Sequence, residues 1–411
     1  MEKSQQNINE FNKMKILTII ANPLGWLNPN MPGGGEITTT NSLEEWNRNG
    51  VGIITIEPES CSVSRRLNKS YKTVLVRLIK KKNNSLTSML IYPFWIIGTI
   101  IAAKREKFDL VYSPTSNITD LLPAFVISKM LKKPIVSSLK ISIYDEGKKK
   151  IFSKIREDGS SILSSILRTI GALIALRLLR KSDLILTPSK PLKDSLISEG
   201  FEEEKIFLID HGIDIKEIKE KNYPQKIYDI CFFSRVEKHK GIYDFLGLCK
   251  MFSKTKINFK AVVIGDGPDM KGVKKYLESN NIEKQVILKG FISDRKRFTY
   301  VKESKILIYP TYFNEGWGCV VPEALNCEVP VISYDMKNTK TIFGHLKSIF
   351  FVKTGNINEL YKESNRILTL NNQEYKKMKD IAKSEGANYD IKKIAKIEIN
   401  KIKKLVLKKN E

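Results

Sequence analysis

The sequence is poor in cysteine and histidine and has no apolar leader, and each shortage argues against a class of protein. Its five cysteines include no Cys-x-x-Cys pair and are odd in number, which favours reduced thiols in a cytosolic compartment over a disulfide scaffold. Its three histidines share no spacing, so we expect no zinc site. Residues 1–13 are polar and lack the apolar core of a secretion signal, so we predict a cytoplasmic location.

What the chain does have is length and positive charge. Its 411 residues exceed what one hydrophobic core normally holds, so we expect two domains. A hydrophobic content of 42% is typical of a globular protein. The net charge of +25 points to nucleic acid, an anionic membrane or anionic small molecules as partners, unless lysine simply coats the surface.

Apolar runs typical of buried strands alternate with helical stretches, which predicts parallel α/β layers. The linker between two such series is expected at the polar, charged residues 215–227. The first series of predicted strands comprises residues 15–20, 52–56, 110–113, 134–138 and 184–187. The second comprises residues 228–233, 260–264, 285–288, 305–310 and 330–334.

Two carboxylates near the end of the second series make the most informative pattern. Glu315 and Glu323 are separated by seven residues that include Gly316-Trp317-Gly318, and Pro322 precedes the second carboxylate. The pattern predicts a strand, a glycine-rich loop, a short helix opening at Pro322 and another strand. Such a helix start attracts anions, and glycines let the backbone approach them, although an acidic residue in a first turn also stabilises a helix without any ligand.

This segment resembles the Glu-x7-Glu signature of the retaining glycosyltransferases of family 4, also called glycosyl transferases group 1. The resemblance implies a GT-B fold, with two Rossmann-like domains facing across a cleft. It implies that Glu315 contacts the transferring sugar and that Glu323 contacts the donor ribose. Gly316, Trp317 and Gly318 would then belong to the donor-binding loop.

Cationic residues after an earlier strand also match the family. Arg235 and Lys240 resemble its Arg-x4-Lys-Gly element, which clamps the donor diphosphate. The chemistry is sound because negative charge grows on the leaving diphosphate, and fixed cations stabilise that charge most in the transition state. Arg235 offers a planar fork of donors and Lys240 a point charge. We therefore assign catalytic roles to Arg235, Lys240 and Glu315.

Glycines and one aromatic complete the predicted donor site. Gly265 and Gly267 form a Gly-x-Gly-Pro turn that resembles the element lining the family's donor cleft, and it lacks the third glycine of a dinucleotide fingerprint. Phe291 stands where the family sets its backbone against the nucleobase, or else it is a core aromatic. Gly34 and Gly35 resemble the Gly-Gly element that faces the donor phosphate, or else they belong to an ordinary loop.

The sequence departs from the family at three places. Lys140 stands where many members carry a catalytic histidine, which leaves it a possible acceptor-side residue. His211 replaces a usual asparagine and is expected to be a turn residue rather than a base. Glu328 stands where a glycine is usual, which would alter the turn into the next strand. The reaction class does not depend on a protein base, because the departing phosphate is thought to take the acceptor proton.

Three further segments bear on membranes and domain arrangement. Residues 65–82 are predicted to form a basic amphipathic helix that contacts a membrane, or else a peripheral helix packed on its own domain. Residues 86–103 are predicted to be a core helix rather than a short transmembrane one, and residues 160–179 a core or interfacial helix. Residues 390–407 have helical spacing, and the GT-B resemblance implies that this helix crosses back onto the first domain.

Together these patterns predict an acceptor-side domain at residues 13–215, a nucleotide-sugar-binding domain at 228–380 and a returning helix at 381–411. The predicted activity is that of a retaining hexosyl- or glycosyltransferase that needs no metal or cofactor and binds no nucleic acid. Its acceptor would be lipid-linked or a growing glycan, with the enzyme peripheral on the inner face of the plasma membrane. The alternatives are a soluble acceptor or a catalytically inactive relative that binds membrane or nucleic acid.

Overall fold

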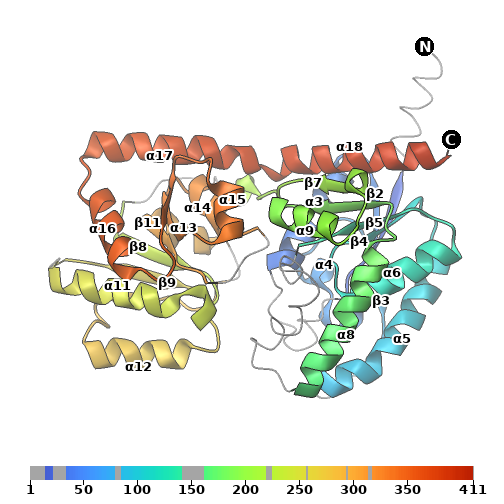
Figure 1. Ribbon diagram of the computed structural model, residues 1–411, viewed down its shortest axis with the longest axis horizontal. Coiled ribbons are helices and arrows are strands. Elements are labelled where there is room, and N and C mark those ends of the chain that lie inside the picture. The colour runs from blue at the N-terminus through green and yellow to red at the C-terminus, as the bar shows by residue number, and fades with distance from the viewer. Residues whose placement is uncertain are drawn as a thin grey trace, which may run out of the picture. The chain divides into compact units, whose positions relative to one another are not determined.

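The computed structural model describes residues 14–21, 34–78, 85–140, 162–218, 225–255, 258–292, 295–312 and 317–410. The chain divides into two compact units, each built on a parallel sheet with helices on both faces (Figure 1). Unit 1 comprises Met1–Gly212 and Ile391–Glu411, and unit 2 comprises Ile213–Asp390.

Unit 1 holds a seven-stranded parallel sheet in the order β3-β2-β1-β4-β5-β6-β7. The strands are β1 Lys15–Ile19, β2 Gly52–Pro58, β3 Lys72–Val76, β4 Leu110–Ser113, β5 Ile135–Ser138, β6 Leu184–Thr187 and β7 Ile206–Leu208. The helices are α3 Gly34–Arg48, α4 Val63–Arg66, α5 Ser85–Lys104, α6 Ile118–Met130, α8 Ile162–Leu179, α9 Lys190–Ser198 and α18 Ile391–Asn410. Short 3-10 turns lie at η1 Glu59–Cys61 and η4 Glu203–Lys205.

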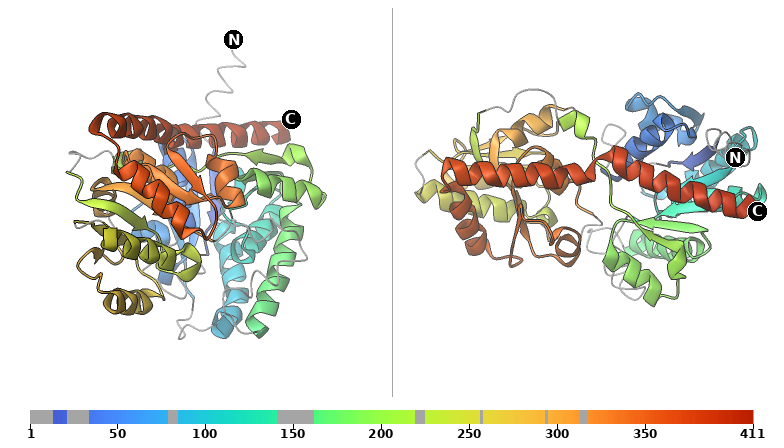
Figure 2. Two further views of the ribbon diagram at one scale, coloured as in Figure 1. Left: turned by 60° about the vertical axis from the view of Figure 1, so that its left-hand side comes forward. Right: turned by 90° about the horizontal axis from the view of Figure 1, so that it is seen from above.

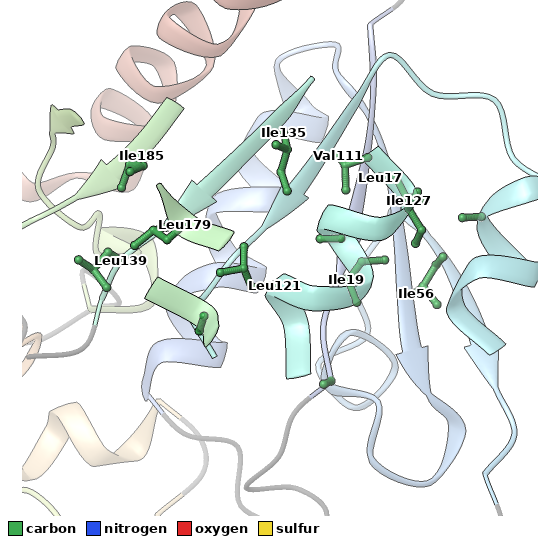
Figure 3. Packing of buried hydrophobic residues seen from close by; sticks show 14 of the residues in the cluster. Leu17, Ile19, Ile56, Val111, Leu121, Ile127, Ile135, Leu139, Leu179 and Ile185 are labelled. Carbon is green, nitrogen blue, oxygen red and sulfur yellow. The ribbon is translucent and has the colours of Figure 1, made fainter. Parts of the chain in front are cut away.

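Both faces of this sheet are buried, which explains why its strands are apolar runs rather than alternating ones. Leu17 and Ile19 of β1 face the cluster beneath α5, α6 and α8, and Figure 3 shows them in this cluster together with Leu121 of α6. Ile16, on the other face, packs in the cluster that includes Ile394 of α18. Helix α18 therefore completes the core of unit 1, along which it lies in Figure 2.

The expected membrane helix at residues 65–82 is wrong. Helix α4 ends at Arg66, and Lys72–Val76 forms the edge strand β3, which pairs in parallel with β2. The β-branched residues Thr73, Val74 and Val76 favour a strand, and pairing with β2 outweighs their helical spacing. Residues 79–82 lie outside the described ranges.

Unit 2 holds a six-stranded parallel sheet in the order β10-β9-β8-β11-β12-β13. The strands are β8 Tyr228–Phe233, β9 Ala261–Ile264, β10 Val286–Leu288, β11 Ser304–Tyr309, β12 Val331–Tyr334 and β13 Ile349–Val352. The helices are α10 Ile215–Ile218, α11 Ile242–Thr255, α12 Met270–Asn280, α13 Lys296–Lys302, α14 Val320–Asn326, α15 Lys337–Phe343, α16 Ile357–Leu368 and α17 Asn372–Gly386, with 3-10 turns at η5 Lys238–Lys240 and η6 Ala387–Tyr389.

Two segments near the unit boundaries differ from a plain linker and a single returning helix. The described part of residues 215–227 belongs to unit 2, where α10 starts at Ile215 and the Ile227 N–H donates to the Glu303 carbonyl at 2.7 Å. Residues 381–411 begin in the last turns of α17, and the chain rejoins unit 1 at Ile391, after η6. Across the described ranges, no helix combines the length and apolar character that crossing a bilayer requires.

Candidate functional site

The loops that follow β8, β9 and β10 are tied to one another at the carboxyl edge of the unit 2 sheet. The Val236 N–H donates to the Asp266 carbonyl at 3.1 Å, and the Gly265 N–H donates to the Gly290 carbonyl at 2.9 Å. Three separately predicted motifs therefore meet at one edge. This is the edge at which parallel α/β sheets bind their ligands.

Close packing explains why glycine occupies both positions of the Gly-x-Gly turn. A Cβ on Gly265, whose φ is 141°, would lie 1.9 Å from the Ser234 carbonyl oxygen. A Cβ on Gly267 would lie 2.3 Å from the Val236 carbonyl oxygen. Any side chain at either position would push the turn away from the loop that carries Arg235.

Arg235 presents its guanidinium to solvent and is oriented by a neighbouring carboxylate. Its side chain is 57% exposed, and Nη2 lies 2.9 Å from Oε2 of Glu237. The same oxygen lies 3.0 Å from Nε2 of His239. The sequence analysis did not predict this role of Glu237, although its position between Arg235 and Lys240 could have indicated it. The arrangement leaves an arginine held in place and open to an anion.

The turn that holds Lys240 packs against the strand leading into the Glu-x7-Glu segment. Gly241 has a φ of 77°, and a Cβ there would lie 1.8 Å from the Pro310 carbonyl oxygen. The Tyr312 N–H donates to the His239 carbonyl at 2.9 Å. The Arg-x4-Lys-Gly loop and the end of β11 are thus fixed to each other.

Glu315 and Gly316, the first part of the predicted signature, lie outside the described residues. The side chain of Trp317 is 3% exposed and belongs to the unit 2 core. Its ring packs edge-on against Phe343 and Tyr389, with centroids 5.7 and 5.5 Å apart. The indole therefore anchors the loop, and only the backbone of Trp317 is left to face a donor.

The rest of the signature forms a short helix that is tied to the layer behind it. Helix α14 begins at Val320, two residues before Pro322, and Glu323 lies half-buried in its first turn. Gly318 precedes it with a φ of 80°. The Asn326 amide donates to the carbonyls of Pro322 and Gly386, both at 2.9 Å, which ties α14 to α17.

Glu328 adopts the left-handed conformation that a glycine would accept without strain. Its φ is 59°, and its carboxylate pairs with Lys383 at 2.5 Å. The sequence departure therefore preserves the turn instead of altering it. Phe291 is 46% exposed, so the structure does not support the core-aromatic alternative for it.

Unit 1 brings Gly35 and Lys140 together at the carboxyl edge of its own sheet. Helix α3 begins at Gly34, and a Cβ on Gly35 would meet no atom within 4 Å. Thr39 links the two, because its hydroxyl donates to the Gly35 carbonyl at 2.8 Å and accepts from Lys140 Nζ at 2.7 Å. The glycine is not forced by packing, so it leaves room for a ligand at the start of α3.

Buried ionisable groups surround Lys140. Burial raises the pKa of Asp120 to about 7, against the lowering effects of its hydrogen bonds and of Lys140. Burial likewise raises the pKa of Glu398 to about 7, while Lys140 lowers it. Burial, aided by Lys140, lowers the pKa of His211 well below 6.5, so His211 is neutral at pH 7. Sequence patterns gave no sign of Asp120 or Glu398, because the fold alone brings both side chains near Lys140.

The described residues include no group of three or more His, Cys, Asp or Glu side chains that is placed to hold a metal ion. Whether the reaction needs a metal therefore stays a prediction. All five cysteines are free in the structure.

Two Rossmann-like parallel sheets, each with predicted ligand-binding residues at its carboxyl edge, define a GT-B protein, which confirms the predicted fold class. Residues 214–385 match the model of the family "Glycosyl transferases group 1", and residues 32–217 match "Glycosyltransferase Family 4". The chain belongs to this glycosyltransferase family, and the resemblance is confirmed.

Individual relatives share little sequence identity with this chain, but each aligns with more than half of its length. The chain is 21% identical over 359 residues to the 2-deoxystreptamine N-acetyl-D-glucosaminyltransferase of Niallia circulans, covering 82% of this chain and 89% of that one. It is 27% identical to the N-acetylgalactosamine-N,N'-diacetylbacillosaminyl-diphospho-undecaprenol 4-alpha-N-acetylgalactosaminyltransferase of Campylobacter jejuni, over 53% of this chain and 59% of that one. The structure of Anabaena HepE with UDP and glucose superposes with a TM-score of 0.72 at 17% identity, covering 95% and 99% of the two chains.

Proposed function

We propose that the protein is a retaining glycosyltransferase that moves a hexosyl group from a nucleotide sugar to a lipid-linked or growing glycan acceptor at the cytoplasmic membrane face. The observation that carries this proposal is the exposed guanidinium of Arg235, held by Glu237 on a loop that is tied to the glycine turn at Gly265. A phosphate-binding cation at the carboxyl edge of a Rossmann-like sheet suits a nucleotide leaving group.

Each donor contact follows from the chemistry of the group that makes it. Arg235 and Lys240 bind the diphosphate and stabilise the charge that grows as the glycosidic bond breaks. Glu323 accepts hydrogen bonds from the ribose, and Glu315 accepts them from the transferring sugar. Phe291 lines the space for the base with its exposed ring. No metal is required, because the two cations supply the positive charge.

The acceptor half of the site is proposed for unit 1. Lys140 is positioned by Thr39 beside the start of α3, where it can bind an anionic acceptor or a donor phosphate. Departure of the diphosphate and arrival of the acceptor on the same face retain the configuration, and the phosphate takes the acceptor proton.

The relatives support two kinds of acceptor. The printed name of the Campylobacter jejuni relative contains a diphospho-undecaprenol acceptor, which favours a lipid-linked substrate here. The name of the Niallia circulans relative contains 2-deoxystreptamine, which keeps a soluble acceptor as the second candidate.

The test begins with thermal-shift measurements against UDP-, GDP- and ADP-sugars and continues with transfer assays using the stabilising donor. Arg235→Ala is expected to lower kcat about 100-fold, the usual cost of removing one preorganised donor from a developing charge. Arg366→Ala is the matched control, because Arg366 also forms an arginine–glutamate pair, with Glu363 on α16. Equal activity of the two variants, or no transfer from any donor, would contradict the proposal.

A further inference from the structure

Helices α5, α6 and α8 cover the same face of the unit 1 sheet. Helix α6 packs between the other two, and residues from all three contribute to one cluster against β1 and β4, among them Trp95, Leu121 and Leu179. Their outer sides therefore face away from the sheet together. More than half of the large apolar side chains that are exposed among the described residues lie on these three helices.

On α8, four exposed isoleucines form a stripe along one side of the helix. Ile162, Ile166, Ile170 and Ile174 are spaced by four residues and are 61%, 42%, 49% and 39% exposed. Residues at this spacing lie on one side of a helix. This side is apolar although it does not contribute to the core of the unit.

A second stripe runs along α5. Phe94, Ile97 and Ile101 are 63%, 55% and 50% exposed, and their spacings of three and four residues again place them on one side of a helix. Soluble monomers rarely expose contiguous apolar area of this kind unless it binds something.

The exposed charges on these helices are all positive. The three helices are 20, 13 and 18 residues long, and their only acidic residue is Asp120, which is buried. In the whole chain, 45 of 411 residues are acidic, so their absence from this surface is notable. Each stripe continues into an exposed basic residue three positions on, with Lys104 after Ile101 and Arg177 after Ile174.

We propose that this outer face, the α5–α8 face, binds the headgroup layer of an anionic membrane. The stripes at Phe94–Ile101 and Ile162–Ile174 enter the boundary with the acyl chains. Lys104 and Arg177 extend their charged ends to lipid phosphates. The proposal deepens the proposed membrane-face function, but the lipid affinity of the face requires neither donor nor transfer.

A membrane suits this face better than a second copy of the chain. In a symmetric dimer the same patch meets itself, so basic residues would face basic residues with no exposed carboxylate on the helices to pair with them. An anionic lipid surface instead supplies negative charge for each cation and an apolar layer for each stripe.

The test is flotation of the full-length protein with vesicles of phosphatidylcholine alone or with one third phosphatidylglycerol, without nucleotide. The protein is expected to float with the anionic vesicles, and Ile166→Gln/Ile170→Gln is expected to weaken binding at least tenfold. The matched control is Ile381→Gln/Ile397→Gln, which alters two exposed isoleucines on α17 and α18. Circular dichroism and melting checks that all variants remain folded.

Charge is tested separately with Arg177→Gln/Lys104→Gln, which should reduce binding to anionic vesicles and raise its sensitivity to salt. The proposal is overturned if the α8 double variant floats like the control, or if light scattering shows a dimer that this variant disrupts. Equal binding to neutral and anionic vesicles would overturn its electrostatic part. Vesicle binding without transfer would reject the proposed function alone, and transfer without vesicle binding would reject the α5–α8 face.

Discussion

The left-handed backbone conformation of Glu328 costs free energy that a glycine at this position would not lose. It is one of four non-glycine residues with positive φ in the described ranges, and its carboxylate pairs with Lys383. Glu328→Ala and Glu328→Gly both lose that pair, so their difference isolates the backbone. The glycine variant is expected to be more stable by about 1 kcal/mol in urea unfolding. Equal stability would show that the turn is not strained.

Glu398 links stability to pH through its raised pKa. Burial raises that pKa from 4.5 to about 7, so between these values the folded protein holds a proton that the unfolded chain has lost. Its contribution to stability is therefore present below pH 4.5 and is lost as pH rises toward 7. Glu398→Gln should flatten the fall in melting temperature between pH 5 and 7. An unchanged slope would assign the pH dependence to other groups such as Asp120.

Individual positions could be predicted from the sequence where a short motif implies a particular backbone turn. Gly265 and Gly267 followed from a strand and a turn, and the packing against Ser234 and Val236 gives the physical reason. For Trp317 the sequence does not reveal the burial of the side chain, because an aromatic between glycines fits a loop that faces a ligand as well as one anchored in a core. Its packing against Phe343 and Tyr389, both distant in the chain, shows that the ring is anchored in the core.

At the scale of elements, the interior strands of both sheets were predicted closely, while three of the four strands at the sheet ends were not. The strands at residues 110–113 and 228–233 agree with β4 and β8. β3 was taken for a helix, and β7 and β13, at the ends of their sheets, were not predicted. Length alone does not explain these misses, because the edge strand β10 has three residues and was predicted at residues 285–288. Pairing with a neighbouring strand stabilises β3, β7 and β13, and that partner lies elsewhere in the chain.

Two glycines at the starts of the predicted phosphate elements should respond differently to alanine. Gly265→Ala puts a Cβ 1.9 Å from a carbonyl oxygen at a φ of 141°, so we expect a loss of about 3 kcal/mol in unfolding free energy. Gly35→Ala meets no atom and lies in helix α3, so stability should hold or rise by up to about 1 kcal/mol. Transfer activity of Gly35→Ala should nevertheless fall if the donor phosphate approaches this backbone. Full activity would remove Gly35 from the site.

At the scale of the whole molecule, the chain passes between the units at two neighbouring points in the structure. Ile213 N–H donates to the Tyr389 carbonyl at 2.7 Å within unit 2, and Gly212 lies against Ile391 within unit 1, where a Cβ would come within 2.4 Å of the Ile391 Cα. Unit 1 is thus discontinuous in sequence, and unit 2 is continuous. Patterns along the sequence favour continuous domains, so the return of residues 390–407 to the first domain was expected only from the family resemblance.

This asymmetry predicts how the units behave when separated. Residues 213–390 contain both unit 2 core clusters and should fold alone, with one cooperative melting transition that the productive nucleotide shifts upward. Residues 1–212 lack α18, whose Ile394, Ile399 and Ile402 fill the face of the sheet beside Trp46, so this fragment should aggregate or melt without cooperativity. Joining residues 391–411 to residue 212 through a flexible linker should restore a cooperative transition. A well-folded 1–212 fragment would show that α18 is dispensable for unit 1. A 213–390 fragment that folds but whose melting temperature responds to no nucleotide would contradict a donor site in unit 2.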